Sequence, residues 1–183
     1  MRAIQFLPAL AAALCLAVAA PGAAAASATE IETRADAAIE RLAETAPEAR
    51  ELMRKATGVL VFPRVIKVGI GVGGEYGEGV LRVNGESVQY YSTASGSLGF
   101  QFGAVSKAQF ILFMTEQALA DFRAAKGWEV GVDGSVTLVK IGTGGSIDTT
   151  SGRDPVIGFV LADRGLMYDL SLAGTKITPI ERE

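Results

Sequence analysis

The sequence predicts an α+β domain with a strongly twisted, barrel-like antiparallel sheet, N-terminal helices and one inserted helix. Three observations predict it. Apolar residues recur every three or four positions before residue 57, they alternate with period two from Gly58 onward, and glycine-containing turn pairs separate the alternating runs. The chain has 183 residues, 49 % of them apolar and 20 % charged, which suits one globular domain.

Residues 1–28 have the three parts of a secretory signal: a positive start, an apolar run and a stretch of small residues. These parts are Arg2, residues 4–20 and residues 23–28. The alternative is a membrane anchor, but the apolar run is shorter than the roughly 20 residues that a spanning helix needs. We therefore expect cleavage before Thr29, with Ser27 as the second choice. The protein is then exported, periplasmic or secreted, and residues 29–183 form its single domain.

Composition excludes several kinds of chemistry. The chain contains no histidine, which rules out Ser-His-Asp and Cys-His nucleophiles and His-ligated metals. Its one cysteine, Cys15, lies in the predicted signal. Removal of residues 1–28 leaves 16 Lys and Arg against 20 Asp and Glu, so the domain is acidic and an unsuitable partner for nucleic acid. We expect no cofactor and no metal.

Residues 29–56 carry one apolar stripe at helical spacing. Its members are Ile31, Ala35, Ala38, Leu42, Ala46, Ala49, Met53 and Ala56. Capping boxes that begin at Thr29 and Thr45, with Pro47 in a first turn, predict two helices or one kinked helix. Gly58 is placed to close the last turn. The polar faces hold seven acidic and five basic residues. This is not the basic face of a membrane-surface helix, so we expect the helices to pack on the sheet.

Three turn signals predict hairpins in the remainder of the chain. They are Asn84-Gly85, Asp133-Gly134 and the three-residue turn Asp163-Arg164-Gly165. One helix interrupts the strands over residues 116–125, with Thr115 as its N-cap and Gly127 at its end. Residues 142–154 lack apolar periodicity, which indicates a surface loop.

The glycine-rich segment 69–79 contains the letters G-x-G-x-x-G at positions 69, 71 and 74. A dinucleotide site needs these glycines to open a helix, yet the following Tyr-Gly-Glu-Gly-Val cannot start one. We therefore interpret the segment as a strand with Gly69, Gly71 and Gly73 on one face, where another backbone or a helix approaches closely. On that interpretation Gly71→Val overpacks the contact and costs roughly 1–3 kcal/mol.

Other catalytic patterns are missing from the sequence. It has no Gly-x-Ser-x-Gly elbow, and its turn carboxylates do not follow a Ca²⁺-loop spacing. These carboxylates are Asp133, Asp148, Asp154, Asp163 and Asp169. Paired carboxylates for a hydrolase depend on spatial proximity, so a hydrolase stays a third interpretation. The aromatic residues lie mostly at alternating strand positions, which favours core packing over a binding platform.

Several motifs, taken together and in order, resemble the SYLF-domain family over roughly residues 37–177. They are Gly58-Val-Leu-Val-Phe-Pro63, the segment from Lys67 to Val80, Ser97-Leu-Gly-Phe-Gln-Phe-Gly103, Phe113-Met-Thr-Glu-Gln-Ala-Leu119, Gly131-Val-Asp-Gly-Ser-Val136 and Gly165-Leu-Met-Tyr-Asp-Leu-Ser-Leu-Ala-Gly-Thr-Lys-Ile177. Eukaryotic members of this family bind phosphoinositides, some bind actin filaments, and no catalytic activity is established for the domain.

The resemblance implies a lipid-binding module with no enzyme activity. We expect association with anionic membrane lipid, of phosphatidylinositol or another anionic phospholipid type, at the cell envelope. The alternative is a structural or protein-binding envelope module without lipid affinity, whose protein partner the sequence does not identify. The candidate lipid-binding residues are Arg64, Lys67 and Lys107. Arg64 and Lys67 follow Pro63, where the first strand enters the glycine segment, and Lys107 joins them if the strands are adjacent.

Overall fold

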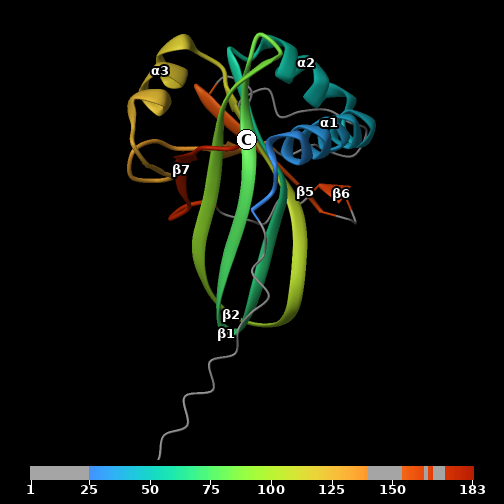
Figure 1. Cartoon of the computed structure of the whole chain (residues 1–183), viewed down its shortest axis with the longest axis vertical. Helices are drawn as coiled ribbons and strands as arrows, with labels where there is room; N and C mark the ends of the chain where they lie inside the picture. Colours follow the sequence, from blue (N-terminus) through green and yellow to red (C-terminus); the bar gives the residue numbers. More distant parts are fainter. Residues whose placement is uncertain (1–24, 140–153, 163–164, 167–171) are drawn as a thin grey trace, which may run out of the picture.

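The computed structural model describes residues 25–139, 154–162, 165–166 and 172–183. In these residues three helices and one mixed sheet of seven strands form a curled half-barrel, as Figure 1 shows, which confirms the predicted α+β fold. The helices are α1 (Ala28–Thr45), α2 (Pro47–Lys55) and α3 (Glu116–Ala124). The strands are β1 (Gly58–Val83), β2 (Glu86–Phe113), β3 (Trp128–Glu129), β4 (Thr137–Leu138), β5 (Val156–Ala162), β6 (Gly165–Leu166) and β7 (Lys176–Ile180).

Two predicted segments fall largely outside the described residues. They are the secretory signal, of which only residues 25–28 are described, and the surface loop over residues 142–154, of which only Asp154 is described. Both stay predictions.

The strands β1 and β2 form one very long antiparallel hairpin. Asn84 and Gly85 close it with φ angles of 55° and 84°, the left-handed conformation of a type I′ turn. Asparagine and glycine are the residues that adopt this conformation most easily, so the turn forms where the sequence predicts it.

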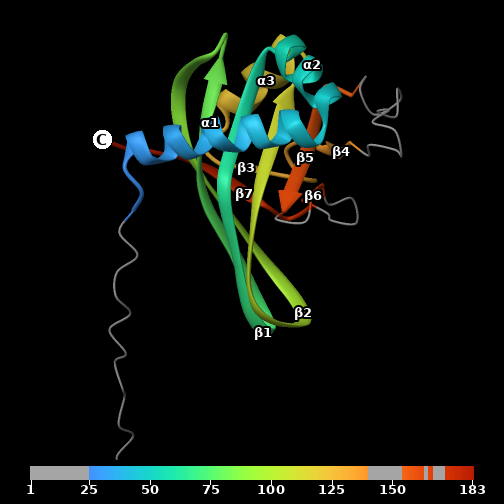
Figure 2. The same cartoon turned by 90° about the vertical axis from the view of Figure 1, so that its right-hand side faces the viewer.

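Both long strands run to the far end of the molecule and bend back there, as Figures 1 and 2 show. At the bend Gly69 pairs with Gly103 and Gly71 pairs with Gly99, and the register shifts between these pairs. The glycine segment is therefore strand, as predicted, and opens no helix. The surroundings of Gly69 and Gly71 are not described, so the proposed role of their glycine face stays a prediction.

The bend brings the two arms of β1 into contact with each other at two other glycines. A Cβ added at Gly77 would lie 2.7 Å from the carbonyl oxygen of Arg64, and one added at Gly79 would overlap the carbonyl of Val61. Glycine permits such close approach because it has no side chain. The half-barrel thus requires glycine at these two positions.

The sheet order β3-β7-β2-β5-β4, with β1 on β2 and β6 on β5, corrects the second predicted hairpin. The segments on either side of Asp133-Gly134 do not pair with each other as antiparallel strands, because β3 pairs with β7 and β4 pairs in parallel with β5. Instead, the Asp133 carboxylate accepts a hydrogen bond of 2.7 Å from the backbone N–H of Glu129 and closes a compact turn. Side-chain capping of this kind competes with strand pairing.

The third predicted hairpin forms between β5 and β6, with Ala162 paired to Gly165. Gly165 is already a strand residue, so it is not the last residue of a three-residue turn as predicted. Residues 163 and 164, which connect the two strands, lie outside the described part.

The two predicted capping boxes of the N-terminal helices are wrong. Ser27 is the N-cap of α1, and its hydroxyl oxygen accepts a hydrogen bond from the backbone N–H of Glu30. Thr45 is the last residue of α1, and its hydroxyl donates to the carbonyl of Arg41. The helix starts earlier than predicted because Ser27 offers an equally good cap two residues upstream.

Of the other predicted helix ends, the start of α3 is confirmed and the ends of α2 and α3 are wrong. The Thr115 cap of α3 is confirmed, since its hydroxyl oxygen accepts from the backbone N–H of Ala118. However, α2 ends at Lys55 with Ala56 as its C-cap, and Gly58 starts β1. At the end of α3 the C-cap is Ala125, not Gly127.

The hydrophobic core lies on both faces of the upper part of the sheet. On one face the apolar stripe of α1 packs against alternating strand residues such as Val61, Phe110 and Leu112. On the other face α3 and the short strands cover residues such as Phe62 and Phe113. The prediction that the N-terminal helices pack on the sheet is confirmed. In the described part of the chain, no helix is long and apolar enough to cross a membrane.

Candidate functional site

The register of β1 and β2 brings two of the three predicted lipid-binding residues together. Val65 pairs with Lys107 and Lys67 pairs with Val105, so Lys67 and Lys107 are neighbours between the arms of the half-barrel. Both ammonium groups contact the carboxylate of Glu75, at 3.7 Å for Lys67 and 2.7 Å for Lys107. The side chain of Lys107 is only 5 % exposed. These two lysines therefore form internal ion pairs with Glu75, and these pairs link the arms of the half-barrel.

Arg64 is placed differently. Its side chain is exposed, and within the described part of the chain it has neither an ion pair nor a hydrogen bond. It lies at a cavity of about 360 Å³ between α1, the two arms of β1 and the end of the chain. The cavity, here called the basic pocket, is lined by Ala25, Ala26, Ile31, Arg34, Pro63, Arg64, Ile66, Tyr76, Gly77, Glu78 and Arg182.

One side of the basic pocket is closed by a tight polar cluster. Arg182 donates to both carboxylate oxygens of Glu78, with Nε at 3.2 Å from Oε2, and the hydroxyl of Tyr76 donates to Oε1 at 2.9 Å. Burial alone would raise the pKa of Glu78, but the hydrogen bonds from Arg182, Tyr76 and the backbone of Ala26 hold it below its ordinary value. The charge of Arg182 is therefore already compensated within the protein.

Two other arginines of the basic pocket stay accessible. Arg34 has only an exposed ion pair with Glu30 on the same helix, and Arg64 has no such partner in the described residues. Exposed pairs of this kind are weak and exchange readily with solvent ions. Apolar groups line the pocket beside them: Ile66 and the ring of Tyr76, a residue that is 52 % exposed. The pocket thus combines positive charge with an apolar rim.

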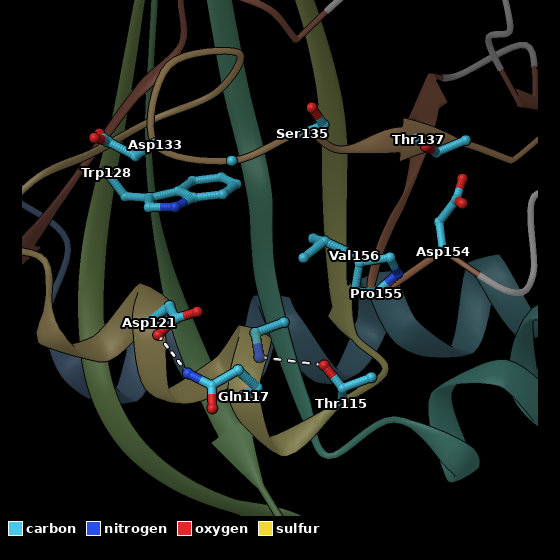
Figure 3. Close-up of a pocket in the computed structure, with 12 residues that line it drawn as sticks. Thr115, Gln117, Asp121, Trp128, Asp133, Ser135, Thr137, Asp154, Pro155 and Val156 are labelled. Carbon is cyan, nitrogen blue, oxygen red and sulfur yellow. Dashed lines mark hydrogen bonds between the residues drawn. The ribbon is translucent and has the colours of Figure 1, made fainter.

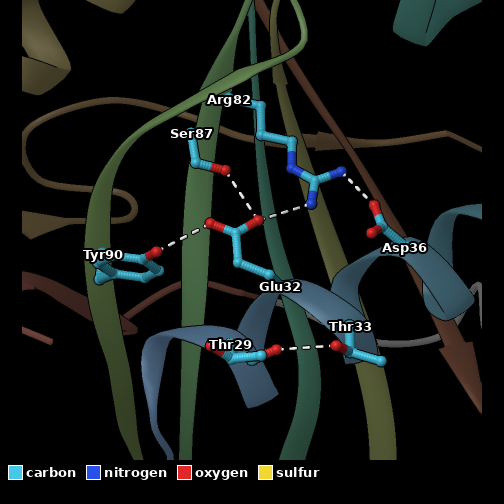
Figure 4. A network of polar contacts seen from close by, with 7 residues as sticks. All are labelled: Thr29, Glu32, Thr33, Asp36, Arg82, Ser87 and Tyr90. Carbon is cyan, nitrogen blue, oxygen red and sulfur yellow. Dashed lines mark hydrogen bonds and ion pairs between the residues drawn. The ribbon is translucent and has the colours of Figure 1, made fainter. Parts of the chain in front are cut away.

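The helix α1 is held next to the basic pocket by a network around Glu32, shown in Figure 4. The Glu32 carboxylate accepts hydrogen bonds of 2.8 Å from Arg82, Ser87 and Tyr90, and Arg82 also donates to Asp36 at 2.6 Å. Burial opposes the charge on Glu32, but these hydrogen bonds outweigh it and lower its pKa below the ordinary value. The network therefore fixes α1 to both long strands.

A second cavity of about 390 Å³ lies between α1, α2 and the Asn84-Gly85 turn, and arginines also line it. Arg82 is engaged by Glu32 and Asp36, and Arg54 has an exposed pair with Glu51. Arg50 is exposed and has no ion pair in the described residues. This cavity provides a comparison for the basic pocket, because it presents the same residue type on a different element.

A third cavity, of about 500 Å³, lies at α3 on the opposite face of the sheet and is acidic (Figure 3). Asp121, Asp133 and Asp154 line it, and no lysine or arginine does. The sequence shows Asp133 and Asp154 only as scattered turn residues. The sheet order brings them together with Asp121 of α3, and no local signal predicts that arrangement. Among the described residues, no group of three acidic, histidine or cysteine side chains is arranged to hold a metal ion.

The described part of the chain is a curled half-barrel with helices on both faces of the sheet and charged, partly apolar pockets. Residues 94–183 match the family Ysc84, described as Las17-binding protein actin regulator. This match agrees with the SYLF-domain resemblance that the sequence motifs indicate. No curated protein matches the chain.

Proposed function

We propose that the protein is a non-catalytic module that binds anionic phospholipid at the cell envelope after export. The observation that supports this best is Arg64, an exposed arginine without a protein partner in the described residues, at the mouth of the basic pocket. The family associates with lipid and with actin regulation, which agrees with a binding role and suggests no reaction. Phosphoinositides and other anionic phospholipids share the phosphate that an arginine binds best.

The charges of the molecule make this attraction local. Without the predicted signal the protein has 16 Lys and Arg against 20 Asp and Glu, a net charge of −4, so its overall field repels an anionic surface. Arg64 and Arg34 act at short range, and each contributes about 1 kcal/mol at such a surface. Tyr76 adds partly exposed apolar area to the same pocket. Aromatic rings of this kind are favoured at the level of lipid headgroups. The expected binding is weak and reversible.

The proposal is tested by co-sedimentation of residues 27–183 with vesicles of phosphatidylglycerol or of phosphatidylcholine. Binding is expected with the anionic vesicles only, and it should weaken as salt rises, because the Debye length falls from about 10 Å at 0.1 M to about 3 Å at 1 M. Equal sedimentation with both vesicles contradicts a headgroup-charge mechanism. Absence of binding to either vesicle contradicts the proposal and leaves the structural or protein-binding module as the function.

A further inference from the structure

The acidic cavity at α3 carries a second function, independent of lipid. We propose that it binds an arginine side chain of a partner polypeptide. The cavity opens between α3, the segment 133–137 and the start of β5, on the other face of the sheet from the basic pocket. For this reason we call it the acidic pocket.

The charges in the acidic pocket are only partly used by the protein itself. Asp121 accepts a hydrogen bond of 2.7 Å from the side chain of Gln117, and Asp133 accepts one from the backbone of Glu129. Asp154 is half-buried and has no hydrogen bond or ion pair in the described part of the chain. Since each carboxylate accepts several hydrogen bonds, acceptor sites are left on all three. No cation among the lining residues offsets them.

A second observation points to a ligand: the indole of Trp128. Its side chain lines the pocket, and the residue is only 4 % exposed, yet its N–H has no acceptor in the described residues. The buried side-chain atoms that lack a partner in the described residues are Glu48 Oε2 and Arg82 Nε, so the indole N–H of Trp128 keeps access to the open pocket, where an acceptor of a ligand can reach it. Figure 3 shows the nitrogen on the ring edge that faces α3, where Asp121 and Gln117 lie. Edge-to-face packing on Phe122, with ring centroids 5.5 Å apart, keeps the indole in place.

These groups match an arginine in a peptide better than a metal ion or a simple amine. A guanidinium has five N–H donors in one plane, which suits carboxylates on several walls of a cavity. The peptide carbonyl beside the side chain supplies the acceptor that the Trp128 N–H lacks. A metal ion is unsuitable, because the carboxylates in the described residues do not converge on one point.

Trp128 is the only tryptophan of the chain, so its fluorescence reports directly on the pocket. The probe is the capped peptide acetyl-Gly-Arg-Gly-amide, and the matched control is acetyl-Gly-Gln-Gly-amide. A saturable change in emission is expected with the arginine peptide only. Equal responses to both peptides, or no response to either, contradict the proposal.

Two variants localise the effect. Asp154→Asn removes one carboxylate charge from the pocket and should weaken binding of the arginine peptide about tenfold, the usual loss for one charged hydrogen bond. Glu116→Gln removes the same charge from α3 outside the pocket lining and should leave binding unchanged. Unchanged affinity in Asp154→Asn, or equal losses in both variants, contradicts the assignment. Neither experiment contains lipid, so its outcome is separate from that of the vesicle test.

Discussion

Glu32 is the residue at which α1 is attached to both long strands, because its carboxylate accepts hydrogen bonds from Arg82, Ser87 and Tyr90. These contacts lower its pKa in the folded protein below the ordinary value of 4.5. A carboxylate with a lowered folded pKa stabilises the protein above the unfolded pKa. This contribution disappears as the pH falls through the folded pKa. The contacts of Glu32 are therefore expected to stabilise the attachment of α1 at neutral pH and to lose this effect in acid.

The variant Glu32→Gln tests this dependence. Its free energy of unfolding should be lower than that of the wild type at pH 6, and the difference should shrink as the pH falls below 4.5, measured by urea unfolding. Glu40→Gln, an exposed change on the same helix, serves as the control and should match the wild type throughout. A wild-type advantage of constant size from pH 3 to 7 would exclude the proposed linkage.

Gly79 and Gly96 provide a matched pair for the role of glycine in the half-barrel. A Cβ at Gly79 would meet the carbonyl of Val61 and the ring of Phe62, whereas a Cβ at Gly96 would meet nothing within 4 Å. Gly79→Ala should lower the free energy of unfolding by about 2–3 kcal/mol through overpacking. Gly96→Ala should change it by no more than about 0.5 kcal/mol. Similar urea midpoints for the two variants would show that the arms of β1 do not need this close contact.

Among the elements, the start of α1 bears on where the predicted secretory signal would be cleaved. Ser27 caps the helix, and the backbone N–H of Ala28 donates to the carbonyl of Glu183 at 3.0 Å. Cleavage before Thr29 removes both groups, and loss of a serine cap typically costs about 1 kcal/mol. Cleavage before Ser27 retains both groups. It removes Ala25 and Ala26 from the lining of the basic pocket and leaves its arginines in place. Of the two predicted sites, we therefore now favour Ser27 as the mature N-terminus.

Intact-mass measurement of the exported protein tests this assignment. The expected mass is that of residues 27–183, while the mass of residues 29–183 would show that the helix cap is dispensable. Retention of Met1 would contradict export through a cleaved signal.

The elements that the sequence predicts well are those with local signals. The Asn84-Gly85 turn, the Thr115 cap and the apolar stripe of α1 each depend on residues a few positions apart. The bend in β1 and β2 has no such signal, because period-two alternation is the same before and after it. The parallel pairing of β4 with β5 also depends on distant segments. It overrides the hairpin that Asp133-Gly134 indicates.

The candidate sites also divide into features with a local sequence signal and features that depend on distant segments. Arg64 and Lys67 come shortly before the recognisable glycine segment, so the sequence suggests them. Only the register shows that Lys67 and Lys107 share Glu75 while Arg64 stays without a partner in the described residues. The pair between Glu78 and Arg182 joins residues 104 positions apart. The acidic pocket likewise draws on three separate segments, which no local pattern connects.

At the scale of the whole molecule, opposite charges gather on the two faces of one sheet. The basic pocket lies on the α1 side and the acidic pocket on the α3 side, as the positions of these helices in Figure 1 indicate. A protein with this arrangement can hold an anionic surface on one face and a basic partner on the other. The lipid proposal and the arginine proposal are thus compatible within one domain.

The comparison of Arg64→Glu with Arg50→Glu on phosphatidylglycerol vesicles tests the central claim most directly. Both changes reverse one exposed arginine, but only Arg64 lines the basic pocket. Removal of one attraction and addition of one repulsion of about 1 kcal/mol each should weaken vesicle binding roughly 30-fold in Arg64→Glu. Arg50→Glu should bind nearly as well as the wild type. Full binding by Arg64→Glu, or equal losses in the two variants, would contradict a lipid site at the basic pocket.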